Sequence, residues 1–150
     1  MVPGARLRVV GGGPYEQELR KTAQESGAGG RIEIGPVDPA DRAQMASLIG
    51  SAALVVLMSE YESQGIAVLE ALSKQKHVLV AETSALNEFV ERGVAAGVPL
   101  NASPAELAQA MCEEIHAPAR PVYELPTWDA WPARSSSGSR PFTSRWRRDG

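Results

Sequence analysis

The fold is decided by residues 53–72, which read ALVVLMSEYESQGIAVLEAL. The first five, Ala53 to Leu57, are all apolar, and a short apolar run predicts a β-strand buried within a parallel sheet. A polar loop follows, and after Gly65 the apolar-rich residues 66–72 predict a helix. A loop that leaves a buried strand and enters a helix is where α/β proteins bind ligands. The stretch therefore predicts an α/β fold with a binding site at this loop.

Two glutamates, Glu62 and Glu70, bracket the start of the predicted helix. Free N–H groups at a helix start bind phosphate, and carboxylates accept hydrogen bonds from sugar hydroxyls. Two other glutamate pairs in the chain are also eight residues apart, so the spacing alone favours solvated helix carboxylates. Only the pair 62/70 straddles a strand-to-helix loop with a glycine at the turn. This context favours a binding role for both carboxylates.

Strands and helices are predicted to alternate on both sides of this stretch. Alternation at this pitch indicates βαβ units, which assemble into a parallel sheet flanked by helices, a Rossmann-like fold. Ser103-Pro104-Ala105-Glu106 has the pattern of a helix capping box. Residues 94–100 fit either an irregular segment or a short strand. The other predicted strands are 6–10, 31–34, 53–57 and 78–81, and the predicted helices are 14–26, 41–49, 65–73, 86–91 and 103–115.

The charge is unevenly distributed along the 150 residues. Residues 1–116 carry nine Lys and Arg against fifteen Asp and Glu, a balance of −6, whereas residues 117–150 carry six Arg against three acids, a balance of +3. The acidic body argues against nucleic-acid binding. We expect one Rossmann-like domain at 1–116, a Pro- and Trp-containing extension at 117–133 and a disordered basic tail at 134–150. The tail is either solvated or in peripheral contact with phosphates or an anionic membrane.

The sequence also predicts where the protein works and what it does not bind. A single cysteine, Cys112, excludes an internal disulfide framework and fits a reducing compartment. No apolar run is long enough to span a bilayer, and the N-terminus lacks a signal-peptide core. His77 and His116 lie far apart, without a cluster of metal-ligand spacing. We therefore expect a cytoplasmic protein with no transmembrane segment, no metal and no cofactor.

Four segments together resemble the C-terminal, donor-binding half of retaining glycosyltransferases with two Rossmann domains, the GT-B type. This large family includes sucrose synthase, glycogen synthases and bacterial mannosyl- and glucosyltransferases. The most specific segment is the two-glutamate stretch 59–72. The other three add register: LRVVGGGP at 7–14, IEIGPV at 32–37, and VLVA at 78–81 followed by LNEFV at 86–90.

The resemblance implies a role for each matched residue in binding a nucleotide diphosphate sugar, which is a substrate. Glu62 would contact hydroxyls of the donor sugar, and the backbone at Gly65 and Ile66 would approach the sugar and the diphosphate. Glu70 would bind the ribose of the nucleotide. The remaining nucleotide-binding positions are Gly12, in a glycine turn that lines the interdomain cleft, and Gly35, Pro36 and Val37 beside the base.

The chain also departs from the family pattern. Family members begin this domain with an earlier strand bearing an arginine and a lysine that clamp the diphosphate, and carry an acceptor-binding domain before it. Neither is found in this sequence, and Gln64 replaces an aromatic residue. Lys74 or Lys76 either replaces a cation in part or is simply solvated. We expect no catalytic residue within the chain, weak or no activity alone, and a separate acceptor-binding domain or chain as partner. The alternative is a non-catalytic α/β module that binds a nucleotide or a partner protein.

Overall fold

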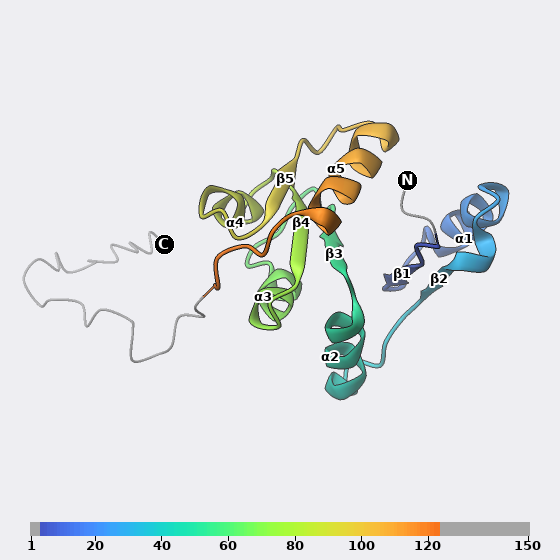
Figure 1. Cartoon of the computed structure of the whole chain (residues 1–150). Helices are drawn as coiled ribbons and strands as arrows, with labels where there is room; N and C mark the ends of the chain where they lie inside the picture. Colours follow the sequence, from blue (N-terminus) through green and yellow to red (C-terminus); the bar gives the residue numbers. More distant parts are fainter. Residues whose placement is uncertain (1–3, 124–150) are drawn as a thin grey trace, which may run out of the picture.

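Strands and helices alternate along residues 4–123, the part of the chain that the computed structural model describes (Figure 1). This confirms the predicted α/β class. The strands are β1 (Leu7–Val10), β2 (Ile32–Gly35), β3 (Leu54–Leu57), β4 (His77–Ala81) and β5 (Ala96–Val98). The helices are α1 (Glu16–Glu25), α2 (Arg42–Ser51), α3 (Ile66–Ser73), α4 (Leu86–Glu91) and α5 (Pro104–His116), with a 3₁₀ turn, η1, at Gly29–Arg31.

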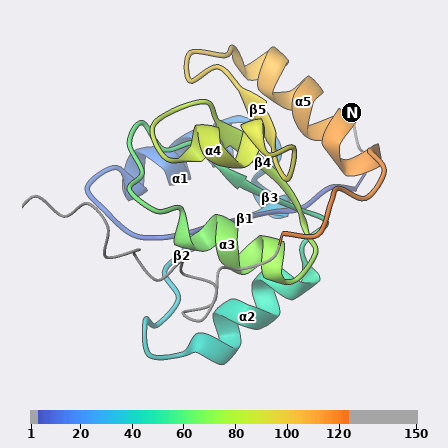
Figure 2. The same cartoon turned by 90° about the vertical axis from the view of Figure 1, so that its left-hand side faces the viewer.

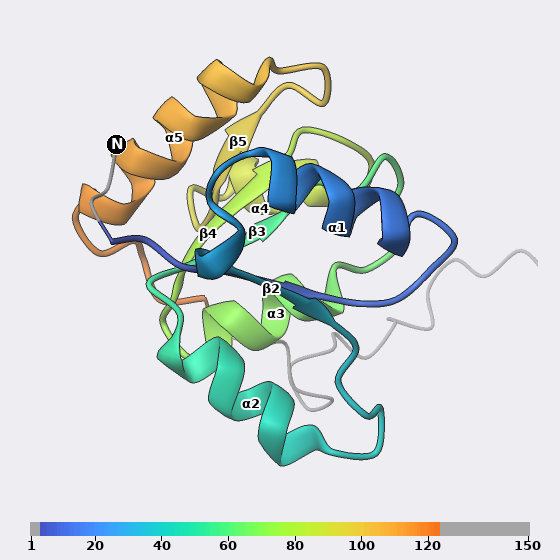
Figure 3. The same cartoon turned by 90° about the vertical axis from the view of Figure 1, so that its right-hand side faces the viewer.

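The strands form two separate parallel sheets. One contains β1 and β2, and the other has the order β3-β4-β5. Figure 3 shows β1, β2 and α1 in front of the three-stranded sheet, which they do not extend. The expectation that β3 is buried within the sheet is therefore wrong. It is an edge strand whose residues are all half-buried. An apolar run predicts a strand, but it does not determine which strands become its neighbours.

The core of the described region is built around β4, the middle strand of the three-stranded sheet. Val78, Leu79 and Val80 are completely buried. Helices α3 and α4 lie on one side of this sheet and α5 on the other (Figure 1). Figure 2 faces the side of α3 and α4, which pack together through Val68, Leu86 and Phe89. This packing fixes α3, whose start was predicted to bind a ligand, to a strand whose last four residues are buried.

The helix starts differ in how their free N–H groups are satisfied. Ser103 and Glu106 form the predicted capping box at α5. Asp41 caps α2 by accepting a hydrogen bond from the N–H of Gln44 at 2.8 Å. The start of α3 has Gly65 at its N-cap and no side-chain cap. Its first N–H groups are therefore left for solvent or a ligand.

The last turn of α5 carries a buried carboxylate that the sequence did not reveal. The apolar residues of α5, Leu107, Ala110, Met111 and Ile115, are only half-buried, whereas Glu114 is 3% exposed. Arg120 donates to both carboxylate oxygens, with N–O distances of 2.7 and 2.6 Å, and His77 Nδ1 lies 3.1 Å from Oε1. Burial acts to raise the pKa of Glu114, but the hydrogen bonds from Arg120 and His77 outweigh it and hold the pKa below its usual value.

The residues after α5 return to the domain. The Tyr123 ring packs edge-on against Phe89, with centroids 5.8 Å apart, and Arg92 lies over its face at 5.7 Å. Tyr123 thus packs against the apolar core of the domain. The Trp residues of the extension and the expected basic tail at 134–150 lie outside the described residues, so the three-part division stays a prediction.

Candidate functional site

Gly65 is the turn from which α3 starts, and two features of its surroundings require glycine. Its φ is +64°, in the left-handed region that side chains disfavour. A Cβ atom here would lie 2.9 Å from Cε2 of Phe89 and 3.4 Å from Cδ2 of Leu86. The glycine therefore allows α4 to pack directly against the entrance of α3. Ile66 and Ala67, which follow this turn, are exposed and their N–H groups have no side-chain cap within residues 4–123, whereas Val68 is completely buried.

Glu62 is held by the segment that links β4 to α4, residues 82–85. Its N–H donates to Ser84 Oγ at 2.9 Å, and its C=O accepts from the N–H of Ala85 at 3.3 Å. Its own Oε1 accepts from the N–H of Ser63 at 3.1 Å. The Glu62 peptide is thus fixed on both sides, and the half-buried carboxylate lies close to the backbone of its own loop.

Glu70 lies in the second turn of α3 and is paired with α2. Arg42 Nη2 donates to Glu70 Oε1 at 3.0 Å. The Arg42 side chain is 81% exposed and that of Glu70 is 34% exposed, so solvent screens the pair. Within residues 4–123, Oε2 of Glu70 has no hydrogen-bond partner and can accept one. Both predicted carboxylates therefore lie on one loop-and-helix unit, one before Gly65 and one after it.

The other predicted nucleotide-binding positions lie at the ends of β1 and β2. Gly35 is the buried last residue of β2, and its C=O accepts from the N–H of Gly11 at 3.3 Å. Gly12 is exposed in the turn after β1. Pro36 is exposed and Val37 is buried in the loop after β2. Among the described residues no hydrogen bond or ion pair joins this group to Glu62 or Glu70, so the structure presents two groups of predicted site residues.

Two large apolar side chains are exposed beside the α3 entrance. Tyr61 is 78% and Ile66 is 59% exposed. They flank the carboxylate of Glu62 and the glycine turn in sequence. An apolar surface next to polar acceptors suits a ligand with both apolar faces and hydroxyl groups, such as a sugar ring.

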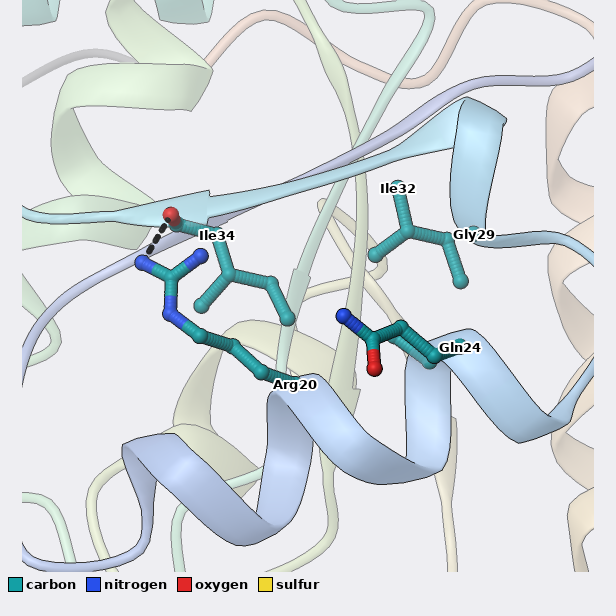
Figure 4. A pocket seen from close by; sticks show the side chains of 6 residues that line it. Arg20, Gln24, Gly29, Ile32 and Ile34 are labelled. Atoms are coloured by element: carbon teal, nitrogen blue, oxygen red, sulfur yellow. Dashed lines mark hydrogen bonds between the residues drawn. The ribbon is translucent and has the colours of Figure 1, made fainter.

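A hollow of about 320 Å³ lies elsewhere, between α1 and β2 (Figure 4). Arg20 spans it and donates to the C=O of Ile34 at 2.7 Å. None of its lining residues, which are Arg20, Ala23, Gln24, Gly29, Ile32 and Ile34, is a predicted site residue. Within residues 4–123, no three His, Cys, Asp or Glu side chains gather as they would around a metal ion. In the same range, none of the helices combines the length and apolarity that crossing a bilayer requires.

The chain matches a protein-family model described as glycosyl transferases, group 1, over residues 2–116. It belongs to this family. The match includes the α3 entrance, both glutamates and the strands that support them, and membership indicates sugar transfer as the general chemistry. No curated protein matches the chain.

Sequence reasoning missed two residues that contact the predicted carboxylates. Arg42 was an ordinary charged residue at the start of a predicted helix, and its distance of 28 positions from Glu70 gave no signal. Ser84 lay in an unassigned linker between a strand and a helix. Its positive φ of 39° is set by tertiary structure, and a serine gives no sign of it in the sequence.

Proposed function

We propose that this chain is the donor-binding domain of a retaining, metal-independent glycosyltransferase. Its donor is a nucleotide diphosphate sugar, and the acceptor is a hydroxyl group. Glu62 binds the donor sugar, the backbone at Gly65 and Ile66 binds sugar and diphosphate, and Glu70 binds the ribose. The observation that carries the proposal is the arrangement of Glu62 and Glu70 around the uncapped start of α3.

The chemistry of this arrangement matches the three parts of such a donor. The positive end of the α3 dipole and its free N–H groups favour a diphosphate. Glu70 Oε2 is a free acceptor for a ribose hydroxyl, and the carboxylate of Glu62 is a fixed acceptor for a sugar hydroxyl. The exposed turn at Gly12 offers backbone groups to the cleft, and the loop that follows Gly35 at the end of β2 offers them to the base.

In the transfer, the bond between the anomeric carbon and the diphosphate oxygen breaks while the acceptor oxygen bonds to that carbon. The acceptor's proton leaves with the nucleoside diphosphate, and the anomeric configuration is retained. Stabilising the departing diphosphate is the main electrostatic task of such a site. The helix start contributes to it, but within residues 4–123 no hydrogen bond joins an arginine or lysine side chain to Gly65 or Ile66. We therefore expect the chain to bind a donor more readily than it turns one over, and to require an acceptor-binding partner.

The test is a thermal-shift titration of the full chain with UDP, GDP, ADP, UDP-glucose, GDP-mannose and ADP-glucose. A ligand at 100 times its dissociation constant adds about 2.7 kcal/mol to the free energy of unfolding, which raises the melting temperature visibly. We expect one nucleotide class to raise it, and Glu70→Ala to abolish the shift. A cooperative melt that none of the six compounds moves would contradict donor binding by this chain.

Two controls separate ligand contact from lost stability. Arg42→Ala removes the same ion pair as Glu70→Ala but keeps the carboxylate. Glu88→Ala removes another exposed carboxylate that is paired with an arginine, in this case Arg92. Both should keep a shift with the nucleotide. Loss of the shift in all three variants would mean that the ion pairs, and not the carboxylate of Glu70, determine binding.

The alternative, a non-catalytic module that associates with a partner protein, is favoured by the edges of the two sheets. Among the described strands, β1 and β3 each pair with one neighbour only, and Leu7 and Val10 of β1 are exposed. Unpaired strand edges with apolar side chains invite association. Sedimentation distinguishes the two. A monodisperse monomer that binds a nucleotide supports the donor-binding domain. Self-association, or binding of a strand from another protein at a sheet edge, without nucleotide binding supports the module.

A further inference from the structure

Ser84 combines an unfavourable backbone with a contact to a predicted site residue. Its φ of 39° lies in the region that glycine adopts easily and that serine adopts at a cost. Its Oγ accepts the N–H of Glu62 at 2.9 Å. A glycine at this position would relieve the backbone but would have no acceptor for that N–H. Strain of this kind persists where the surrounding structure enforces it, often at functional sites.

The surrounding linker holds the same loop at further points. Ala85 donates its N–H to the C=O of Glu62 at 3.3 Å, and Thr83 Oγ1 donates to the C=O of Ser59 at 2.9 Å. Immediately after the linker, Leu86 and Phe89 of α4 pack against Gly65. The linker 82–85 and α4 therefore hold the loop that enters α3 at several points along its length. Within this linker, Ser84 is the one residue whose side chain forms a hydrogen bond with the backbone of Glu62.

The position of the Glu62 carboxylate depends on this peptide. Oε1 accepts from the N–H of Ser63, the next residue, so a rotation of the Glu62 peptide moves both the carboxylate and its donor. Within residues 4–123, Oε2 of Glu62 has no hydrogen-bond partner. A fixed peptide therefore presents one free carboxylate oxygen in a constant direction, as selective binding of a hydroxyl group requires.

We propose that Ser84 is a positioning residue that fixes the Glu62 peptide and so sets the affinity for the sugar part of the donor. The proposal rests on the proposed function, because it requires that Glu62 contacts the sugar. It predicts that Ser84 contributes to the gain in affinity that the sugar adds to the nucleotide, and not to the affinity for the nucleotide itself.

The experiment uses the full chain with Ser84→Ala and Ser84→Gly, and Thr83→Val as the matched control. Thr83→Val removes another hydroxyl of the same linker, one that contacts Ser59 instead of Glu62. The first measurement is amide hydrogen exchange at Glu62 by NMR, without ligand. We expect both Ser84 variants to exchange about tenfold faster than the wild type, because the hydrogen bond is lost, and Thr83→Val to stay slow. Ser84→Gly should melt no lower than Ser84→Ala, because it relieves the positive φ.

The second measurement compares dissociation constants of UDP, GDP and ADP with those of UDP-glucose, GDP-mannose and ADP-glucose. For the pair that binds, we expect both Ser84 variants to raise the dissociation constant of the sugar conjugate about 3- to 10-fold, the range of one hydrogen bond. The dissociation constant of the nucleoside diphosphate should change by less than about twofold. Glu62→Ala should remove the gain from the sugar altogether. Thr83→Val should leave it within about twofold.

The outcomes separate the two proposals. If Glu62→Ala removes the gain and the Ser84 variants leave it unchanged, Ser84 has no positioning role and the proposed function stands. An equal loss in Thr83→Val would assign the effect to the linker as a whole and overturn the role of the Ser84 hydroxyl. If none of the six compounds binds, or if Glu62→Ala leaves the gain intact, the proposed sugar site is wrong and the role of Ser84 is overturned with it.

Discussion

Replacing Arg120 by leucine tests whether the chain beyond α5 stabilises the domain through a buried charge. Leucine keeps an apolar side chain in place of the arginine stem, so the change reports mainly the loss of charge and hydrogen bonds. The variant leaves the Glu114 carboxylate, which is 3% exposed, with His77 as its remaining partner. Breaking a buried ion pair costs about 3–5 kcal/mol. Because Arg120 is partly exposed, water can reach the vacated space, and we expect a loss of about 2–3 kcal/mol.

The pH dependence of this loss follows from the pKa of Glu114. The folded protein holds this pKa below its usual value, so the unfolded chain binds the proton more readily. The contribution of the pair is therefore complete above the ordinary glutamate pKa of about 4.3, and it declines as the pH falls through the lower folded-state pKa. The difference between wild type and Arg120→Leu should be full at pH 7 and should shrink below about pH 4.

The assay is urea unfolding followed by far-UV circular dichroism at pH 7 and at acid pH, for the wild type, Arg120→Leu, Glu114→Leu and the double variant. Replacing both charges by apolar groups is often close to neutral, so the double variant should lose less than Arg120→Leu alone. A loss below about 0.5 kcal/mol in Arg120→Leu, the size of an exposed pair, would refute the reasoning. An equal loss at both pH values would refute the assignment to Glu114.

Three further predictions concern stability and are measured by urea unfolding at pH 7. Gly65→Ala should lower the free energy of unfolding by about 2–4 kcal/mol, because it adds a clash with Phe89 to a positive φ. The control Gly93→Ala, where φ is +70° and no atom lies near the added Cβ, should lower it by about 1 kcal/mol. Equal losses would show that packing against α4 does not matter. Tyr123→Ala should lower the free energy of unfolding by about 1–2 kcal/mol, because the edge contact with Phe89 and its burial are lost, and Tyr123→Phe should lower it by less than about 0.5 kcal/mol. An alanine variant as stable as the wild type would contradict this prediction. Ser103→Ala should cost about 1 kcal/mol as the capping box of α5 is lost, and an unchanged unfolding midpoint would contradict the cap.

Local signals were enough to place most helices and strands. The capping box at Ser103 and Glu106 predicted the start of α5, because the motif satisfies its own N–H groups within four residues. The apolar run before Gly65 and the glycine itself predicted β3, the turn and α3 in the right order. Each of these features is determined by residues close in sequence, which is what a pattern can report.

Features that depend on distant partners could not be predicted. Glu114 looked like a solvated residue, and it is buried because Arg120, in a segment of different composition, neutralises it. The edge position of β3 depends on strand pairing, which an apolar run does not encode. The contacts of Arg42 with Glu70 and of Ser84 with Glu62 each join residues more than twenty positions apart.

The same distinction applies to the candidate site. The sequence identified the carboxylates, because their chemistry and their place around a strand-to-helix loop are local. It did not identify what holds them, because the contacts come from distant residues. Phe89 packs so close to Gly65 that a Cβ atom there would lie 2.9 Å from its ring. Ser84, which accepts the N–H of Glu62, is 22 positions away in sequence. A carboxylate on a polar loop and another on an exposed helix turn would ordinarily be mobile acceptors. Here the backbone of Glu62 is held by hydrogen bonds and the carboxylate of Glu70 is paired with α2, so donor affinity should respond to the loss of this preorganisation as well as to the loss of either charge.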